Sequence, residues 1–333
     1  MIKKVLTISI AAYNVAQFIE NTLDSLLVSE KLLNKLEVYV IDDGGADETL
    51  KIAMDYERRY PNIIYAIHKE DEGYGSTFNC CIERATGKYF KLLDGDDWFL
   101  KENLVKIIPL LEELDSDIIV NDFYKCKSES DYELIHAHSR SQGEELDISR
   151  FVSDIQIGMW ALIYRTDLLK RSGLKLPENM FYVDQVYSTF PFANAHTVKF
   201  LNLPLYCYRV GRDGQSVSRE SRVKYADQMI KCSKILLDFC EGKRSEQNEN
   251  YKYILNRVSI YYQTAFRTLL LKEINKKNRD EIVEFENDAK LRCFDVYNEC
   301  LKIGKAGLFI NLFRKSKYYM YWAFKIHRLP NWK

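Results

Sequence analysis

The chain has 333 residues, of which 47% are hydrophobic and 29% are charged. That length exceeds a typical single domain, and that composition is typical of a folded globular protein rather than of a disordered chain. Lysine plus arginine and aspartate plus glutamate both number 48, so the formal net charge is zero and we expect no nucleic-acid partner.

The cysteines and the apolar runs predict a cytoplasmic protein. The chain has eight cysteines, none of them in a C-x-x-C pair, and we expect all to be reduced thiols. The N-terminal apolar run is too short for a secretory signal. No run reaches the length of about 18 apolar residues that would predict a transmembrane helix.

Strand and helix signals alternate along the first third of the chain. Apolar, β-branched runs predict strands at residues 5–12, 37–41, 63–67, 89–93 and 117–120, and helical spacing predicts helices at 17–27, 48–60, 78–85 and 104–114. This alternation predicts an α/β fold with a mostly parallel central sheet flanked by helices. Ligands bind such sheets at the carboxyl ends of the strands, where three of these runs end in polar or acidic loops.

The pattern becomes less regular after residue 123 and helical after residue 218. Strands are expected at 160–164, 197–201 and 205–209, and a short helix at 184–192. Helices are expected at 225–240, 251–271 and 279–301, followed by a tail of aromatic and basic residues. We therefore predict an α/β domain over residues 1–217 and a C-terminal helical region over residues 218–333.

The segment KYFKLLDGDDWF places three aspartates within four positions, directly after a predicted buried strand. Carboxylates this close repel one another unless they share a cation, and aspartate oxygens suit Mg²⁺ or Mn²⁺. We expect Asp96 to be the direct ligand, with Asp94 and Asp97 close to it. The alternative is a solvated acidic turn that caps the next helix.

The segment VIDDGGADET follows another predicted interior strand. Asp42 and Asp43 end that strand, and the two glycines after them allow the backbone to approach a ligand closely. A carboxylate here can accept a hydrogen bond from a base N–H or a ribose hydroxyl. A helix N-cap explains Asp47, but it explains neither Asp42 nor Asp43.

Together with two further segments, these motifs resemble the non-processive bacterial family 2 glycosyltransferases, which have the GT-A fold. The segments are AAYNVAQFIENTLDSLL, VIDDGGADET, EGYGSTFNCCIERATGKYFKLLDGDDW and YVDQVY, in the family's order. The resemblance implies that residues 1–217 form a GT-A domain that binds a nucleotide diphosphate sugar. It assigns the nucleotide and diphosphate to Ala12, Tyr13, Asn14, Asp42, Asp43, Asn79, Asp94 and Gly95, and the metal ion to Asp96 and Asp94.

The catalytic base that the resemblance implies is Asp184. Val183 stands where the family commonly has an acidic residue, and the alternative for Asp184 is a simple helix N-cap. Trp160 is either a platform for a sugar face or a core tryptophan. Arg209 and Arg212 lie in a segment that resembles a loop closing over the donor diphosphate, for which arginine is well suited, or they lie in a surface loop.

We therefore expect an inverting glycosyltransferase that uses a nucleotide diphosphate sugar, with uridine favoured, and a saccharide or lipid-linked saccharide acceptor in cell-surface polysaccharide or glycoconjugate synthesis. The alternatives are a non-catalytic nucleotide-sugar binding protein and a sugar-phosphate nucleotidyltransferase, although AAYNVAQF lacks the phosphate loop of the latter. The tail predicts either peripheral contact with the inner face of the cell membrane or a helix packed on the protein.

Overall fold

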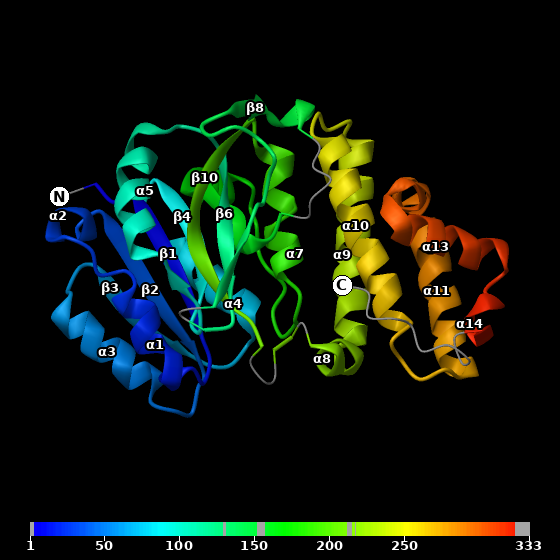
Figure 1. Ribbon diagram of the computed structural model, residues 1–333, viewed down its shortest axis with the longest axis horizontal. Helices are drawn as coiled ribbons and strands as arrows, with labels where there is room; N and C mark the ends of the chain where they lie inside the picture. The colour runs from blue at the N-terminus through cyan, green and yellow to red at the C-terminus, as the bar shows by residue number, and fades with distance from the viewer. Residues whose placement is uncertain (1–2, 129–130, 152–156, 212–214, 217, 324–333) are drawn as a thin grey trace. The chain divides into compact units, whose positions relative to one another are not determined.

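The structure is a computed structural model, and it describes residues 3–128, 131–151, 157–211, 215–216 and 218–323. The chain forms two compact units, Met1–Asp213 and Gly214–Lys333. The described strands all belong to the first unit, and the described part of the second unit is helical (Figure 1).

Strands and helices largely alternate along the first 126 residues of the first unit. Its described strands are β1 (Leu6–Ala12), β2 (Leu36–Asp43), β3 (Ile64–Lys69), β4 (Tyr89–Asp94), β5 (Trp98–Phe99), β6 (Ile118–Cys126), β7 (Tyr132–Ile135), β8 (Glu145–Asp147), β9 (Leu162–Arg165) and β10 (Thr197–Arg209). Its described α-helices are α1 (Ala16–Asp24), α2 (Glu30–Leu33), α3 (Thr49–Arg59), α4 (Tyr74–Arg84), α5 (Lys101–Glu113), α6 (Thr166–Arg171) and α7 (Asp184–Tyr187). Its described 3₁₀ turns are η1 (Ile148–Arg150), η2 (Met159–Ala161) and η3 (Phe190–Asn194).

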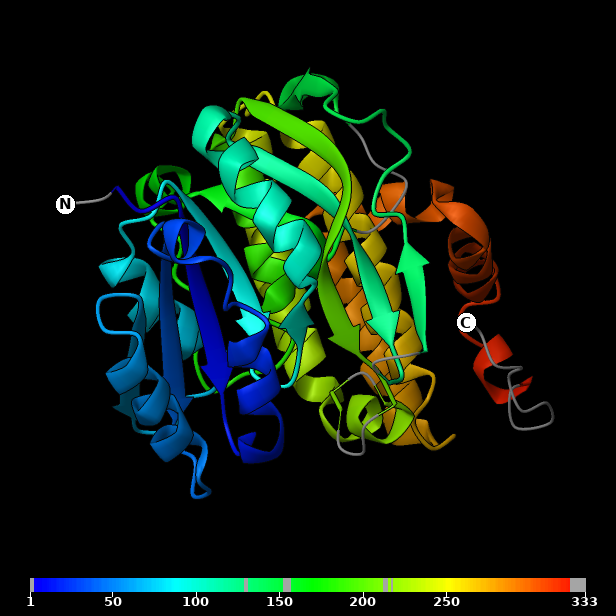
Figure 2. The ribbon, with the colours of Figure 1, turned by 60° about the vertical axis from the view of Figure 1, so that its left-hand side comes forward.

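The described strands form one sheet in the order β3-β2-β1-β4-β9-β6-β10-β5, with β7 beside β6 and β8 beside β10 (Figures 1 and 2). The strands β3, β2, β1 and β4 are mutually parallel, as the alternation of strands and helices predicted. The strand β9 runs antiparallel to both of its neighbours, β4 and β6. The sheet is therefore mixed beyond β4, because a later part of the chain enters between β4 and β6.

The parallel half of the sheet is buried on both faces, which explains its apolar strand sequences. All eight residues of β2 are buried. The helix α4 packs on β1 and β2, whereas α3 packs on β3 and against α1. The buried carboxylate of Glu37 accepts hydrogen bonds from the hydroxyls of Thr7 at 2.7 Å and Thr86 at 2.8 Å, so its burial leaves no unsatisfied charge.

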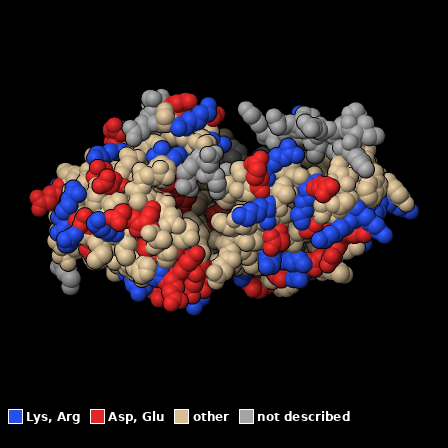
Figure 3. Space-filling view, turned by 90° about the horizontal axis from the view of Figure 1, so that it is seen from below, with Lys and Arg blue, Asp and Glu red and all other residues tan. Residues whose placement is uncertain are grey.

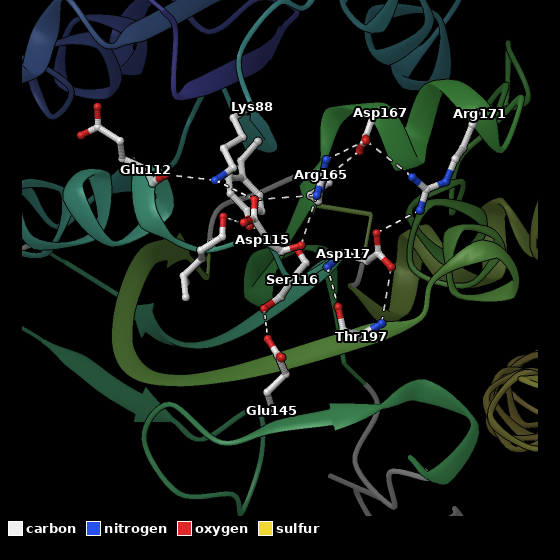
Figure 4. A network of polar contacts seen from close by, with 12 residues as sticks. Lys88, Glu112, Asp115, Ser116, Asp117, Glu145, Arg165, Asp167, Arg171 and Thr197 are labelled. Atoms are coloured by element: carbon white, nitrogen blue, oxygen red, sulfur yellow. Dashed lines mark hydrogen bonds and ion pairs between the residues drawn. The ribbon is translucent and has the colours of Figure 1, made fainter.

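A polar network fastens the sheet edge at which β4, β6 and β10 begin (Figure 4). Asp117 accepts hydrogen bonds from Arg171 Nη2 at 2.9 Å and from the backbone N–H of His196 at 2.7 Å. Arg165, at the end of β9, donates to both oxygens of Asp167 at 3.1 Å and 2.8 Å. These contacts lie at the amino ends of the parallel strands, opposite the edge where ligands are expected.

The strands β4 and β9 separate before they reach that other edge. Phe90 opposite Tyr164 is their last residue pair, whereas β9 stays paired with β6 as far as Leu162. The ammonium group of Lys91 donates to the carbonyl oxygens of Trp160 at 2.9 Å and Leu162 at 3.1 Å. This buried side chain therefore satisfies two carbonyls that strand pairing would otherwise satisfy. Burial lowers the pKa of Lys91 to about 7.

The second unit is built around a buried carboxylate. Glu286 accepts hydrogen bonds from Tyr262, Arg314 and Tyr318, and the arginine also pairs with its charge. The described helices of this unit are α8 (Arg219–Lys224), α9 (Ala226–Ser245), α10 (Tyr251–Leu269), α11 (Lys276–Arg292), α12 (Phe294–Glu299), η4 (Cys300–Lys302), α13 (Gly304–Lys315) and α14 (Met320–Ala323).

Some helix boundaries differ from those expected from the sequence. The helix expected at 184–192 ends at Tyr187, and the 3₁₀ turn η3 follows with Pro191, which has no N–H to continue an α-helix. The helix expected at 279–301 is interrupted at Cys293, whose backbone is extended with φ −150°. The helix α4 begins at Tyr74 rather than at residue 78, with Gly73 at φ +80° as its N-cap.

Among the described helices, none combines the length and the apolar composition needed to cross a membrane. On the face shown in Figure 3, lysine and arginine side chains are interspersed with aspartate and glutamate. That mixture is the surface counterpart of the equal numbers of acidic and basic residues in the sequence.

The burial of Lys91 predicts a specific dependence of stability on pH. Its pKa falls from 10.5 to about 7 on folding, so between these values the unfolded chain binds a proton that the folded chain does not. Stability therefore rises with pH in this window, by up to about 1.4 kcal/mol per pH unit. We expect the unfolding free energy of the wild type minus that of Lys91→Met, measured in urea, to grow by about 2 kcal/mol between pH 7.5 and 9.

Lys51, an exposed lysine of α3, provides the control. The unfolding free energies of the wild type and of Lys51→Met should change with pH in parallel. Parallel curves for the wild type and Lys91→Met would contradict the prediction.

Candidate active site

The carboxyl ends of β1, β2 and β4 meet at one edge of the sheet. Ala11 lies opposite Asp94, and Ala12 lies opposite Asp42. The two acidic segments that the sequence singled out therefore flank the end of β1 on either side. This edge is the expected ligand-binding edge of a parallel sheet.

The loops after β1 and β2 are bonded to each other. The side-chain oxygen of Asn14 accepts a hydrogen bond from the backbone N–H of Ala46 at 2.8 Å. Asn14 has φ +51°, a left-handed conformation that asparagine tolerates better than most residues. A Cβ on Gly45 would lie 2.7 Å from Asp42 Oδ1, so the close approach of these loops requires glycine. Tyr13 is 53% exposed and offers an accessible aromatic ring at this edge.

Asp42 and Asp43 are both buried but differ in their partners. His68 Nδ1 lies 2.6 Å from Asp42 Oδ2, whereas Asp42 Oδ1 has no hydrogen-bond partner among the described residues. Asp43 Oδ1 accepts hydrogen bonds from Lys69 Nζ at 2.8 Å and Ser76 Oγ at 3.1 Å. Asp43 is thus held by the protein, and Asp42 retains an acceptor that a ligand N–H or hydroxyl can satisfy.

The acidic loop, residues 94–97, brings three carboxylates together. Asp94, Asp96 and Asp97 each have an oxygen within 4.8 Å of the others. Burial, and then the charges of Asp94 and Asp96, raise the pKa of Asp97 well above its usual range. A divalent cation relieves this repulsion, and hard carboxylate oxygens are the ligands that Mg²⁺ and Mn²⁺ prefer, so the cluster fits such an ion.

Asp97 is the buried anchor of the acidic loop. Its carboxyl group accepts hydrogen bonds from the Tyr206 hydroxyl at 2.6 Å and the backbone N–H of Arg209 at 2.7 Å. The Tyr206 oxygen in turn accepts from the backbone N–H of Asp94 at 3.1 Å. A Cβ on Gly95 would lie 2.9 Å from the Ala11 carbonyl oxygen, so the loop also needs glycine against the end of β1.

Arg209, at the end of β10, borders the acidic loop. Its Nε donates to the carbonyl oxygen of Asp96 at 2.9 Å, and its guanidinium lies 4.8 Å from the ring centres of both Phe18 and Trp98. The residue therefore lies where a contact with a diphosphate is expected, and that contact stays a prediction. Arg212, the other predicted arginine, lies outside the described residues.

Trp160, in η2, lies in an aromatic stack. Its ring centre is 5.5 Å from that of Phe123 and 4.5 Å from that of Tyr208, and both pairs are stacked. Its indole Nε1 is buried without a hydrogen-bond partner among the described residues. A Cβ on Gly158 would lie 2.5 Å from the indole ring, so glycine is needed beside it. The role as a sugar platform stays a prediction.

Asn79, in α4, is bonded to the segment that leads to Asp184. Its Nδ2 donates to the Leu176 carbonyl oxygen and to Glu178 Oε1, both at 3.0 Å, and its Oδ1 accepts from the Leu176 N–H at 2.9 Å. Asn79 therefore fixes residues 176–178 in place. The nucleotide contact implied by the family resemblance stays a prediction.

Asp184 is the first residue of α7. Val183 is the N-cap residue and makes no side-chain cap, so the alternative role of Asp184 as a helix N-cap is wrong. The Asp184 carboxylate accepts a hydrogen bond from Gln185 Nε2 at 2.7 Å. Tyr182, two residues earlier, has φ +67°, a strained conformation for a bulky residue of the kind that clusters at functional sites.

Two tyrosines connect Asp184 with the acidic loop. Burial, and then the charges of Asp94 and Asp184, raise the pKa of Tyr74. Burial and the charges of the acidic loop and of Asp184 raise the pKa of Tyr208 in the same direction. The charges of the loop and of Asp184 thus act on both phenols. The helix α7 packs against η2, and η2 packs against β4, whose end carries the acidic loop.

Sequence reasoning missed three residues that shape this region, namely Tyr74, Lys91 and Tyr206. A lysine within the apolar strand sequence YFKLLD is a signal, because a buried ammonium needs acceptors. The alternation in LYCYR, which places Tyr206 and Tyr208 on one face of β10, is a second, because a buried phenol needs a hydrogen-bond partner.

Comparison with known proteins identifies the domain. The family described as glycosyl transferase family 2 matches residues 7–172. The chain is 30% identical over 214 residues to the uncharacterized glycosyltransferase EpsJ of Bacillus subtilis (strain 168), covering 61% of this chain and 60% of EpsJ. It is 25% identical over 215 residues to the poly(ribitol-phosphate) beta-N-acetylglucosaminyltransferase TarS of Staphylococcus aureus (strain MW2), covering 64% of this chain and 36% of TarS. The aligned part is thus less than two thirds of either relative's length.

Solved structures share the fold. The crystal structure of residues 1–349 of S. aureus TarS with UDP-GlcNAc has a TM-score of 0.56 at 19% identity, covering 95% of this chain and 93% of that chain. The mannosyltransferase PcManGT from Pyrobaculum calidifontis, in complex with GDP-Man and Mn²⁺, has a TM-score of 0.51 at 15% identity, covering 88% of each chain. These likenesses confirm the GT-A fold. The family match over residues 7–172 shows that this domain belongs to glycosyltransferase family 2.

Proposed function

We propose that the protein transfers a sugar from a nucleoside diphosphate sugar to a hydroxyl group of a saccharide or lipid-linked saccharide, with inversion at the anomeric carbon. The observation that carries the proposal is that Asp42 and the acidic loop lie at one sheet edge, while the helix α7 of Asp184 packs against η2, and η2 packs against β4, the strand that ends at the acidic loop. The complexes of TarS with UDP-GlcNAc and with UDP support uridine as the base.

In this proposal Asp184 is the general base. Its carboxylate accepts the proton of the acceptor hydroxyl, whose oxygen attacks the anomeric carbon. The new carbon–oxygen bond forms on the face opposite the bond to the diphosphate, which breaks and leaves its electron pair on the diphosphate. The configuration therefore inverts in one displacement. A positioned general base contributes about 10²–10⁴-fold to such a step.

Asp94 and Asp96 are the proposed ligands of Mg²⁺ or Mn²⁺. Asp97 instead holds the loop, because its two oxygens accept the hydrogen bonds from Tyr206 and Arg209. A divalent ion, when bound, neutralises charge on the leaving diphosphate. The complex of PcManGT with GDP-Man and Mn²⁺ supports this choice of ion.

The name of a relative supports the proposed acceptor class. The name of TarS assigns it a poly(ribitol-phosphate) acceptor, which supports a cell-surface polymer as the acceptor class here.

In α13 the exposed residues Lys305, Leu308, Leu312 and Lys315 are spaced by three or four positions and share one face. Leucines flanked by lysines suit an anionic membrane surface, so we place the protein peripherally at the inner face of the cell membrane.

The first prediction tests the base. Asp184→Asn should lower turnover at least about a hundredfold and leave donor binding nearly unchanged, because the amide cannot accept the proton. Steady-state transfer or donor hydrolysis measures turnover, and calorimetric titration measures donor affinity. Asp55→Asn, on the exposed face of α3, is the matched control and should behave as the wild type. Wild-type turnover in Asp184→Asn would remove this residue from the mechanism.

The second prediction tests the metal site. Asp96→Asn should weaken Mn²⁺-dependent donor binding by about tenfold or more, because it removes a charged ligand oxygen. The measurement is a titration of the donor at several Mn²⁺ concentrations, with Asp55→Asn again as control. Unchanged donor affinity at every Mn²⁺ concentration would count against Asp96 as a ligand.

The third prediction tests membrane contact by flotation with vesicles that contain anionic lipid. Deleting residues 304–333 would also remove Phe313, which is buried, and the Arg314 partner of Glu286, so loss of binding could reflect unfolding. The double variant Leu308→Gln, Leu312→Gln changes only exposed side chains and should lose most of the vesicle-bound fraction. The control Leu291→Gln, at an 86% exposed leucine of α11, should float as the wild type does. Equal flotation of both variants would exclude α13 as the contact.

A further inference from the structure

His68 contacts the buried carboxylate of Asp42 at the end of β2. The residue lies on β3, directly opposite Asp42 in the strand register. Its Nδ1 is 2.6 Å from Asp42 Oδ2, and its side chain is 53% exposed, whereas that of Asp42 is 2% exposed. An ionised carboxylate only accepts hydrogen bonds, so Nδ1 of His68 carries the proton and donates it. The imidazole thus holds one oxygen of Asp42 on the side of β3.

The other oxygen of Asp42 borders the loops that follow β1 and β2. A Cβ on Gly45 would lie 2.7 Å from Asp42 Oδ1 and 3.3 Å from the backbone nitrogen of Asn14, so both atoms border one small space that glycine leaves open. Oδ1 is buried and has no hydrogen-bond partner among the described residues. Because a buried acceptor without a partner is costly, its presence at this edge points to a ligand that donates to it.

The neighbouring carboxylate of Asp43 is held differently. Its Oδ1 accepts hydrogen bonds from Lys69 Nζ at 2.8 Å and Ser76 Oγ at 3.1 Å, so two side chains fix it. Within the part of the chain that the structure describes, the donor to Asp42 is His68 alone. The terminal torsion of an aspartate side chain has a broad minimum, so the Asp42 carboxylate can turn when this donor is removed. The direction of Oδ1 therefore depends on His68.

The atoms around this space match one edge of uracil. The backbone N–H of Asn14 is a donor beside the acceptor Asp42 Oδ1, and uracil has a carbonyl oxygen beside its N3–H. The corresponding ring nitrogen of cytosine carries a lone pair instead, which the charge of Asp42 would repel. A correctly directed Oδ1 therefore favours uracil over cytosine.

Resting on the proposed function, we propose that His68 is a positioning residue for base recognition: its Nδ1–H fixes the Asp42 carboxylate so that Oδ1 accepts the N3–H of uracil. His68 acts on the choice of base through Asp42. Its removal should therefore weaken the binding of uridine nucleotides more than that of cytidine nucleotides.

The experiment compares two nucleotides that differ only at this edge of the base. Dissociation constants for UDP and CDP, each with Mn²⁺, are measured by calorimetric titration, with competition against UDP where CDP binds weakly. We expect the wild type to bind UDP at least about tenfold more tightly than CDP. In His68→Leu, the affinity for UDP should fall at least about tenfold and that for CDP by less than about threefold, because the N3–H loses its acceptor.

Two further variants separate the donor role from a structural one. His68→Asn keeps an N–H group bonded to Cγ, as Nδ1 is, and should stay within about threefold of the wild type for both nucleotides. The matched control is His136→Leu, because His136 Nδ1 lies 2.9 Å from Oδ2 of the buried Asp122 on β6. This variant removes the same kind of contact elsewhere in the domain and should leave both affinities unchanged.

The outcomes distinguish this inference from the proposed function. The positioning role is wrong if His68→Leu weakens UDP and CDP equally, if it leaves UDP unchanged, or if His68→Asn loses as much affinity as His68→Leu. A wild type without preference for UDP over CDP would also contradict it. In each of these cases, a wild type that binds UDP and turns over a UDP-sugar still supports the proposed function. A wild type that binds neither nucleotide would overturn both the inference and the uridine donor.

Discussion

The buried carboxyl group of Asp97 is the contact on which the candidate site depends most. Three carboxylates within four residues would repel one another in a free loop, and burial makes the ionised form of Asp97 costlier still. The Tyr206 hydroxyl and the Arg209 N–H hold that group against β10, and the same tyrosine oxygen accepts from the Asp94 N–H. A strand from late in the sequence thus fixes the loop that follows β4, so that Asp94 and Asp96 are presented together.

A second set of contacts holds the opposite side of the site. Asn79 bonds residues 176–178, and Gly75 allows the backbone of Pro177 to lie against α4. Lys91 supports the turn that carries Trp160 where β4 and β9 separate, and so keeps the two strands apart without unsatisfied carbonyls. The bonds of Lys91 replace strand pairing where β4 and β9 separate, beside the proposed substrate site. The separation of β4 and β9 therefore leaves these two carbonyls satisfied.

The candidate residues differ in how far the sequence could predict them. Asp42, Asp94 and Asp96 could be singled out because each follows a buried strand, and parallel strands deliver their carboxyl ends to one edge. Asp184 required the family resemblance, since nothing in its local pattern separates a base from a helix cap. Tyr206 escaped notice because its importance lies in a partner about a hundred residues away in sequence, Asp97. Asn79 was predicted to contact the nucleotide, but its bonds to Leu176 could not be predicted for the same reason.

Local periodicity alone determined the alternation of strands and helices, the parallel half of the sheet and the acidic edge. Burial on both faces and helical spacing can each be recognised within a short segment of sequence. Only the tertiary structure decided that β9 enters antiparallel between β4 and β6, that α7 ends at Tyr187, and which aspartate of the acidic loop is buried. The physical reason is that strand order and side-chain partners depend on contacts between distant segments. A carboxylate looks the same in sequence whether it meets a tyrosine hydroxyl in the core or faces a ligand.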